Sequence, residues 1–196
     1  TWGIYLALVF SRIAIGWRRR YATRQAALLR TVERWVVEHA DVSIASSEPD
    51  RKGLELLGGR RVRLVPHPVE VPARRPGKRA LARTARVLFA ANFAYRPNRL
   101  SAGWMFGSVW PAVVRRIPNA ELRVIGPASE QLRGLVPVGA VIHGVVADIW
   151  PEYAAAWLAV SPAEVGSGAP YKVLHAYAAG RAAVVRRAGL TGLADG

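Results

Sequence analysis

The spacing of hydrophobic residues divides the chain into an irregular first part and a second part, from residue 86 onward, where short apolar runs alternate with amphipathic segments. In the first part, apolar residues recur at helical intervals over residues 18–39, which predicts one long helix. Shorter elements are expected after it, namely a strand over 41–45, a break over 46–49, a helix over 50–57 and a strand over 61–65.

The second part predicts a regular α/β fold. Strands are expected over 86–91, 121–126, 140–146, 158–162 and 182–186. Helices are expected over 98–117, interrupted at Pro111, and over 130–135, 148–156 and 170–179. Strands separated by helices imply a doubly wound, Rossmann-like parallel sheet with right-handed crossovers. Ligands of such sheets bind beyond the carboxyl ends of the strands, so the loops that follow the strands are the candidate site.

A proline-rich stretch separates the two parts. Residues 66–84 contain four prolines, one glycine, many basic residues and no hydrophobic period, which is typical of an interdomain linker. We therefore expect residues 1–70 to belong to one domain, 71–84 to be linker and 85–196 to form a second domain. The chain starts at Thr1 and stops at Gly196 after an apparent strand and turn, so we expect a segment of a longer protein, with the second domain truncated.

Composition narrows the possible partners and chemistry. The absence of cysteine excludes disulfides, thiolate catalysis and Cys-ligated zinc within this chain. The net charge of +15 comes mostly from arginine and favours anionic partners, such as phosphates, anionic lipids or nucleic acid; a genome-wide preference for arginine is the alternative explanation. No pair of histidines has metal-ligand spacing and no GxSxG motif occurs, so we expect neither a metal site nor acyl-transfer chemistry.

The first twenty residues are amphipathic. The apolar run Ile4–Phe10 is too short to span a bilayer, which takes about 20 apolar residues. Residues 1–20 fit an interfacial helix, with aromatic side chains near the apolar layer and Arg18–Arg20 at the headgroups. A helix packed within a domain is the alternative.

The loop after the fourth strand of the second part is the sharpest candidate site. Gly166, Ser167 and Gly168 leave backbone N–H groups open to a ligand, and Pro170 suits the first position of the helix that follows. The N-terminus of that helix offers free donors and a positive dipole end, and Lys172 lies in its first turn. The loop is therefore predicted to hold a diphosphate, the alternative being a glycine turn with an exposed lysine.

Other candidate side chains lie in the same loops. Arg96 or Arg99, after the first strand, could reach a phosphate, and Asn98 could cap the following helix. Glu164 could accept hydrogen bonds from sugar hydroxyls or pair with Lys172 or an arginine. His175, one turn after Tyr171, could reach the ligand or lie on the helix surface.

Four stretches resemble the C-terminal domain of group 1 (family 4-like) GT-B glycosyltransferases in order and spacing. They are FAANFAYRPNR (89–99), WPAVVRRIPNAELRVIG (110–126), GVVADIWPEYAAAWLAVSP (144–162) and GSGAPYKVLHAYAAGRAAVV (166–185). Residues 40–70 resemble the end of the preceding domain of the same family. Together with residues 40–70, the four stretches cover about half of the chain.

The resemblance implies a retaining, metal-independent transferase that takes a sugar from a nucleoside diphosphate sugar and gives it to a glycan or lipid-linked acceptor. It implies that Gly166–Gly168, Lys172 and Arg96 hold the diphosphate. It also implies that the backbone around Gly144, Val145 and Val146 faces the nucleobase. The family's ribose-binding glutamate falls on His175, the first glutamate of the paired motif falls on Ser167, and the usual Thr-Arg pair falls on Ala169-Pro170. An imidazole lacks the two acceptor oxygens of a carboxylate.

Three functions follow from these observations. The first is an active glycosyltransferase of polysaccharide biosynthesis, cytoplasmic, with peripheral contact to the anionic inner face of a membrane and no cofactor. The second is a degenerate family member that binds or acts as a scaffold without catalysis. The third is a basic nucleic-acid-binding protein, which the placement of the tryptophans in apolar helical patterns disfavours. No specific nucleic acid is therefore expected as a partner.

Overall fold

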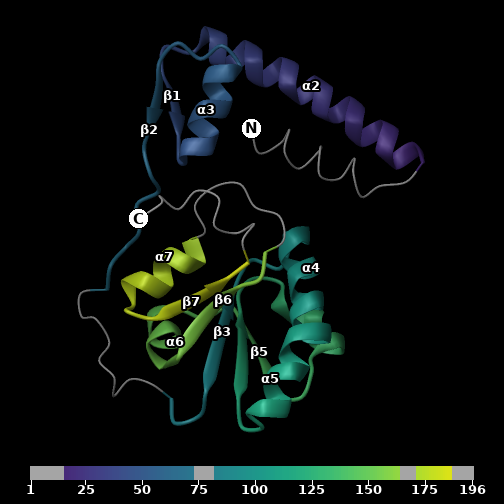
Figure 1. Ribbon diagram of the computed structural model, residues 1–196, viewed down its shortest axis with the longest axis vertical. Coiled ribbons are helices and arrows are strands. Elements are labelled where there is room, and N and C mark those ends of the chain that lie inside the picture. The colour runs from purple at the N-terminus through teal and green to yellow at the C-terminus, as the bar shows by residue number, and fades with distance from the viewer. Residues whose placement is uncertain (1–15, 73–81, 164–170, 187–196) are drawn as a thin grey trace. The chain divides into compact units, whose positions relative to one another are not determined.

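The computed structural model describes residues 16–72, 82–163 and 171–186, and within them the chain forms two compact units. The first unit comprises residues 16–67, and the second comprises 68–72, 82–163 and 171–186 (Figure 1). The expected linker, 71–84, lies mostly outside the described residues. Each unit has its own sheet.

The first unit consists of α2 (Trp17–His39), β1 (Ser43–Ala45), α3 (Glu48–Leu56) and β2 (Val62–Leu64). The strands β1 and β2 pair in parallel, with α3 as the crossover between them. The predicted break of the strand at 46–49 is confirmed, since β1 ends at Ala45, but α3 begins at Glu48, two residues earlier than expected. Ser47 caps this helix by accepting a hydrogen bond from the Asp50 N–H at 3.3 Å, and a proline is tolerated in the first turn.

Helix α2 has two contrasting faces. Ala22, Ala26 and Val37 are buried within the first unit. The opposite side carries exposed large apolar residues at helical spacing, Trp17, Tyr21, Leu28, Val32 and Trp35, which we call the α2 stripe. None of the helices in the described ranges is both long and apolar enough to cross a membrane.

The second unit has five parallel strands in the order β5-β4-β3-β6-β7. They are β3 (Arg86–Ala90), β4 (Glu121–Ile125), β5 (Ala140–Gly144), β6 (Leu158–Ser161) and β7 (Ala182–Val185). The connecting elements are α4 (Arg96–Trp104), η2 (Met105–Val109), α5 (Trp110–Arg116), η3 (Ser129–Leu135), α6 (Trp150–Ala155) and α7 (Tyr171–Ala178). The predicted doubly wound α/β sheet is thus confirmed, although most strands are one or two residues shorter than expected.

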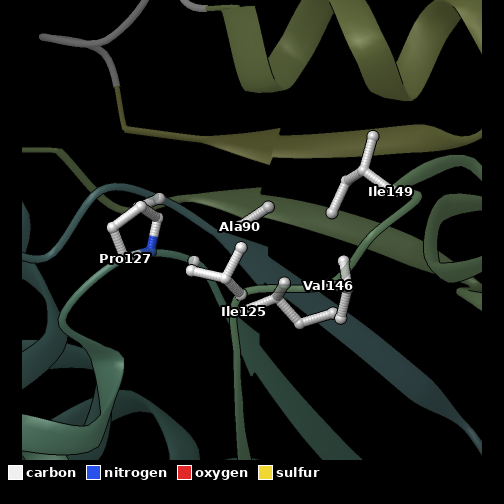
Figure 2. A pocket seen from close by; sticks show the side chains of 8 residues that line it. Ala90, Ile125, Pro127, Val146 and Ile149 are labelled. Atoms are coloured by element: carbon white, nitrogen blue, oxygen red, sulfur yellow. The ribbon is translucent and has the colours of Figure 1, made fainter.

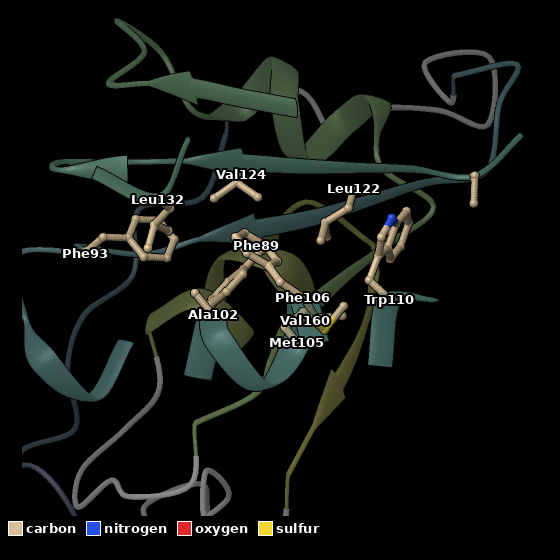
Figure 3. Packing of buried hydrophobic residues seen from close by; sticks show 11 residues of the cluster. Phe89, Phe93, Ala102, Met105, Phe106, Trp110, Leu122, Val124, Leu132 and Val160 are labelled. Carbon is tan, nitrogen blue, oxygen red and sulfur yellow. The ribbon is translucent and has the colours of Figure 1, made fainter. Parts of the chain in front are cut away.

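Each face of the sheet has its own hydrophobic core. On one face, Phe89, Leu122 and Val124 pack against Phe106 and Trp110 from the η2–α5 segment (Figure 3). On the other face, side chains of β3, β4 and β6 pack against α6 and α7; the buried members are Leu88, Ile125, Tyr153, Ala156, Ala159, Ala176 and Ala179. Burial on both faces explains why the strands are mostly apolar, with the charged residues of β3 and β4, Arg86, Glu121 and Arg123, held in ion pairs.

The predicted interruption of the long helix at Pro111 takes the form of one π-helical turn. Between α4 and α5, residues Met105–Val109 adopt i→i+5 hydrogen bonding. A proline has no N–H and its ring clashes with the carbonyl four residues earlier, so the backbone widens before Pro111 rather than breaking. The predicted helix over 130–135 is a 3-10 helix, Ser129–Leu135, which is tighter than an α-helix.

Three backbone hydrogen bonds join the loops at the carboxyl ends of β3, β4 and β5. The N–H of Ala91 donates to Ile125, that of Phe93 to Pro127 and that of Gly126 to Gly144, at 2.7–3.0 Å. Gly126 has φ +132°, and a Cβ added there would lie 2.0 Å from the carbonyl oxygen of Ala91. Only glycine permits this close approach of two loops.

Gly126→Ala is expected to destabilise the fold by roughly 2–4 kcal/mol, because it adds a methyl group against the backbone at a disfavoured φ. Urea denaturation followed by tryptophan fluorescence measures this change. The matched control is Gly103→Ala in α4, where a Cβ meets nothing within 4 Å; it should be neutral or stabilising by about 1 kcal/mol. Equal stabilities of the two variants would contradict this account of the turn.

Candidate functional site

The strand order creates one topological switch point. The chain runs outward from β3 through β4 to β5, then returns to the other side of β3 to form β6 and β7. The chain therefore continues from β3 toward β4 on one side and from β6 toward β7 on the other. Ligands of open parallel sheets bind beyond the carboxyl ends of the strands at such a switch point.

An apolar pocket of about 230 Å³ opens beside the switch point. Figure 2 shows Ala90, Ile125, Pro127, Val146 and Ile149 around it, from the carboxyl ends of β3 and β4 and from the segment after β5. Its lining also includes Ala91, Gly126 and Val145. Val145 and Val146, two of the three predicted nucleobase neighbours, thus line this pocket. The third, Gly144, is buried, and its carbonyl accepts the hydrogen bond from Gly126.

Lys172 lies in the first turn of α7 (Tyr171–Ala178). Its Nζ donates a hydrogen bond to Oδ1 of Asn98 at 3.3 Å and lies 6.0 Å from the centroid of the Phe89 ring. The described part of the chain gives this ammonium group no carboxylate partner. Burial disfavours the charged form and lowers the pKa of Lys172 to about 8. The amine is therefore a largely buried cation that can be neutralised near physiological pH.

The contact between Lys172 and Asn98 brings the N-termini of α7 and α4 together. Arg96, the first residue of α4, precedes Asn98 by two residues, so the structure places it at the same edge of the sheet as Lys172, and its side chain is exposed. Arg99 instead donates hydrogen bonds to the carbonyls of Phe93 and Ala94, at 2.9 and 2.7 Å, and holds the loop together. Of the two arginines, Arg99 is thus engaged in holding the loop.

The predicted capping role of Asn98 is wrong. Helix α4 begins at Arg96, with Tyr95 at the N-cap position, because Pro97 suits the first helical turn. Asn98 already lies inside the helix. Its Nδ2 donates to the carbonyl of Asn92 at 2.7 Å, while its Oδ1 accepts from Lys172.

His175 belongs to an aromatic cluster that sequence reasoning missed. Its ring lies 5.3 Å from Trp150 and 5.9 Å from Tyr153 in edge-on geometry, and 6.0 Å from Tyr171. Tyr153 is fully buried beneath it and donates its hydroxyl to the backbone carbonyl of Lys172 at 3.3 Å. Burial lowers the pKa of His175, and the charge of Glu70 opposes that shift. In the sequence, the i, i+3 spacing of Trp150 and Tyr153 indicates that the two rings lie on one helix face. The packing of α7 against these rings depends on tertiary structure and could not be predicted from that spacing.

The remaining predicted site residues, Glu164, Gly166, Ser167 and Gly168, lie outside the described residues, so their role stays a prediction. Within the described ranges, no group of three metal-ligating side chains is close enough to hold a metal ion. The described site is therefore built from an apolar pocket, the Lys172 amine, two helix N-termini and the aromatic cluster around His175.

Comparisons with known proteins agree with the α/β fold. Residues 84–196 match the family described as glycosyl transferases group 1, which covers more than half of the chain. No curated protein sequence matches the chain.

Solved structures share the fold at low sequence identity. One is Anabaena HepE in complex with UDP-glucose, with a TM-score of 0.65 and 16% identity, over 83% of this chain and 49% of that one. Another is the pneumococcal O-GlcNAc transferase GtfA in complex with UDP and GlcNAc, with a TM-score of 0.60 and 12% identity, over 78% of this chain and 32% of that one. A third is WaaG, a glycosyltransferase involved in lipopolysaccharide biosynthesis, with a TM-score of 0.55 and 16% identity, over 90% and 50%. The chain thus spans half or less of the length of these structures.

Between about pH 8 and pH 10.5, the free energy of unfolding should rise with pH by roughly 1–3 kcal/mol through Lys172. The sign follows because the pKa in the folded state lies below that of the unfolded chain, so the unfolded state binds more protons in this window. Urea denaturation across the window, with Lys172→Met as reference, isolates this contribution. Parallel pH profiles for the two proteins would show that Lys172 is not buried as described.

Proposed function

Because the chain belongs to the group 1 glycosyltransferases, we propose that it binds a nucleoside diphosphate sugar at the switch point and transfers the sugar to a glycan or lipid-linked acceptor. Two similar structures carry such donors or their parts, UDP-glucose in HepE and UDP with GlcNAc in GtfA. Residues 1–70 then belong to the domain that precedes the linker 71–84, and 85–196 belong to the donor-binding domain.

The observation that carries the proposal is the largely buried ammonium group of Lys172. The described residues give this cation no carboxylate partner, which is unfavourable, and a bound diphosphate would supply negative charge. The N-terminus of α7 adds backbone donors and a positive dipole end, and Arg96 adds a guanidinium from α4. Gly166, Ser167 and Gly168 complete this diphosphate site in the proposal.

The apolar pocket suits the nucleobase. A flat heterocycle buries weakly hydrated ring faces against Ile125, Val146 and Ile149, while exposed backbone groups near Val145 can read its polar edge. A nucleoside diphosphate would then run from the pocket to Lys172, with the ribose near His175. Glu164 remains the proposed partner of the sugar hydroxyls.

The chemistry rests on stabilising the leaving group. The bond between the anomeric carbon and the diphosphate oxygen breaks, an acceptor hydroxyl oxygen bonds to that carbon on the same face, and the proton of that hydroxyl passes to the departing diphosphate. Negative charge grows on the departing diphosphate, where Lys172 and the α7 N–H groups offer pre-oriented stabilisation. This mechanism retains the anomeric configuration and needs no metal ion.

Lys172→Ala is expected to weaken binding of UDP at least about tenfold, since it removes the charge that faces the diphosphate. Isothermal titration calorimetry with UDP, GDP, ADP and CDP measures this loss and identifies the base. The control is Lys52→Ala, an exposed lysine of α3 in the other unit, which should leave affinity unchanged. Absence of binding for all four diphosphates would refute the proposed donor site.

Binding without transfer would identify the chain as a degenerate, non-catalytic family member. The observation that favours this second candidate is His175, which stands where the family resemblance places a glutamate. A coupled assay distinguishes the active transferase from the non-catalytic family member. It follows the release of UDP from UDP-glucose in the presence of acceptor glycans. Turnover that Lys172→Ala abolishes supports the transferase, and binding with no turnover for any sugar donor supports the scaffold.

We further propose that the first unit contacts an anionic membrane surface through the α2 stripe. Arg20 and Arg24 lie one helical turn from Trp17 and Tyr21, so cationic and aromatic side chains alternate along the exposed side of α2. Aromatic residues favour the membrane interface and arginines favour anionic headgroups, so the stripe has the chemistry of an interfacial helix.

Replacing both Trp17 and Trp35 with serine is expected to weaken binding to vesicles of phosphatidylglycerol and phosphatidylcholine about tenfold, since two exposed indoles are lost from the stripe. Vesicle sedimentation measures the effect. Val138→Ser, an equally exposed apolar position in the second unit, should leave binding unchanged. Equal binding to pure phosphatidylcholine, or no effect of the double substitution, would rule out this surface.

A further inference from the structure

The covalent order of a nucleotide places the ribose between two features of this site. The nucleobase pocket includes Ile149, which directly precedes Trp150, and the diphosphate position is at Lys172, which directly follows Tyr171. The ring of His175 lies within 6.0 Å of both Trp150 and Tyr171. If the pocket and Lys172 hold the two ends of a nucleotide, the His175 ring lies beside the sugar that joins them.

The surroundings of His175 are aromatic, which is unusual for a position that binds a sugar. Neither ring nitrogen of His175 has a hydrogen-bond partner among the described residues, and three aromatic rings surround the imidazole. Burial lowers the pKa of His175 and so disfavours the protonated imidazole. The charge of Glu70 raises the pKa of His175 and so opposes the effect of burial. Glu70 is exposed on the segment 68–72, and no hydrogen bond joins it to His175.

A neutral imidazole discriminates weakly between hydroxyl patterns. It can make one neutral hydrogen bond, whereas a carboxylate offers two charged acceptor oxygens to adjacent hydroxyls. Loss of a hydroxyl that a charged acceptor holds costs roughly tenfold to a hundredfold in affinity, while loss of a neutral hydrogen bond costs a few-fold.

We propose that His175 determines specificity because it does not recognise the ribose 2′-hydroxyl. The site therefore accepts 2′-deoxyribonucleoside diphosphates as well as ribonucleoside diphosphates. This inference rests on the proposed donor site and narrows its substrate class. It extends the set of sugar donors to those carried on deoxynucleotides.

The test compares matched pairs, UDP with 2′-deoxy-UDP, and likewise the GDP, ADP and CDP pairs, by calorimetry on the 196-residue chain. For the base that binds, the ratio of the two dissociation constants should be below about fivefold. A larger ratio overturns the inference and leaves the donor site intact. Failure of every diphosphate to bind overturns the donor site itself, and the inference with it.

Two variants assign the effect to residue 175. His175→Glu should raise the preference for the ribonucleotide to about tenfold or more, whereas His175→Gln should leave the ratio low. Tyr177→Glu places the same charge on an exposed position of α7 and should not change the ratio. An unchanged ratio in a folded His175→Glu protein, checked by circular dichroism, overturns the role of His175. If that variant does not fold, the ratios of the unsubstituted chain and of His175→Gln decide.

Discussion

The parallel pairing of β3 with both β4 and β6 is the constraint on which the rest of this structure depends. It makes β3 the central strand and gives each face of the sheet a separate hydrophobic core. It also places residues from distant parts of the chain at one edge of the sheet, among them the hydrogen-bonded Lys172 and Asn98 and the residues that line the apolar pocket.

Burial of Lys172 links this architecture to function. An ammonium group is costly to remove from water, and here an amide oxygen and an aromatic face are the contacts that the described residues provide. A fold seldom keeps such a group unless a ligand compensates for the cost, so perturbed lysines concentrate at functional sites. Burial disfavours the charged form of His175 on the same helix, so in this account the diphosphate is held mainly by Lys172 and by the backbone of α7.

The sequence predicted the elements that depend on local pattern. The five strands, their parallel order and the interruption near Pro111 follow from apolar periodicity and from the geometry of proline. Asn98 was misassigned because capping preference is a local rule, whereas its actual partners, Asn92 and Lys172, are set by tertiary structure. The aromatic cluster around His175 was missed for the same reason, since Trp150 and Tyr171 are distant in sequence. The glycine loop 166–168 and Glu164 lie outside the described residues and stay predictions.

The most direct measurement of the central claim is the pKa of Lys172 with and without bound UDP. The chain has three lysines, Lys52, Lys78 and Lys172, so heteronuclear NMR of the side-chain amines, with Lys172→Met for assignment, resolves the signal. We expect a pKa of about 8 for the free protein and a rise of about two or more in the complex, because the diphosphate stabilises the charged form. A Lys172 signal that titrates at the same pH in the presence of saturating UDP would contradict the account.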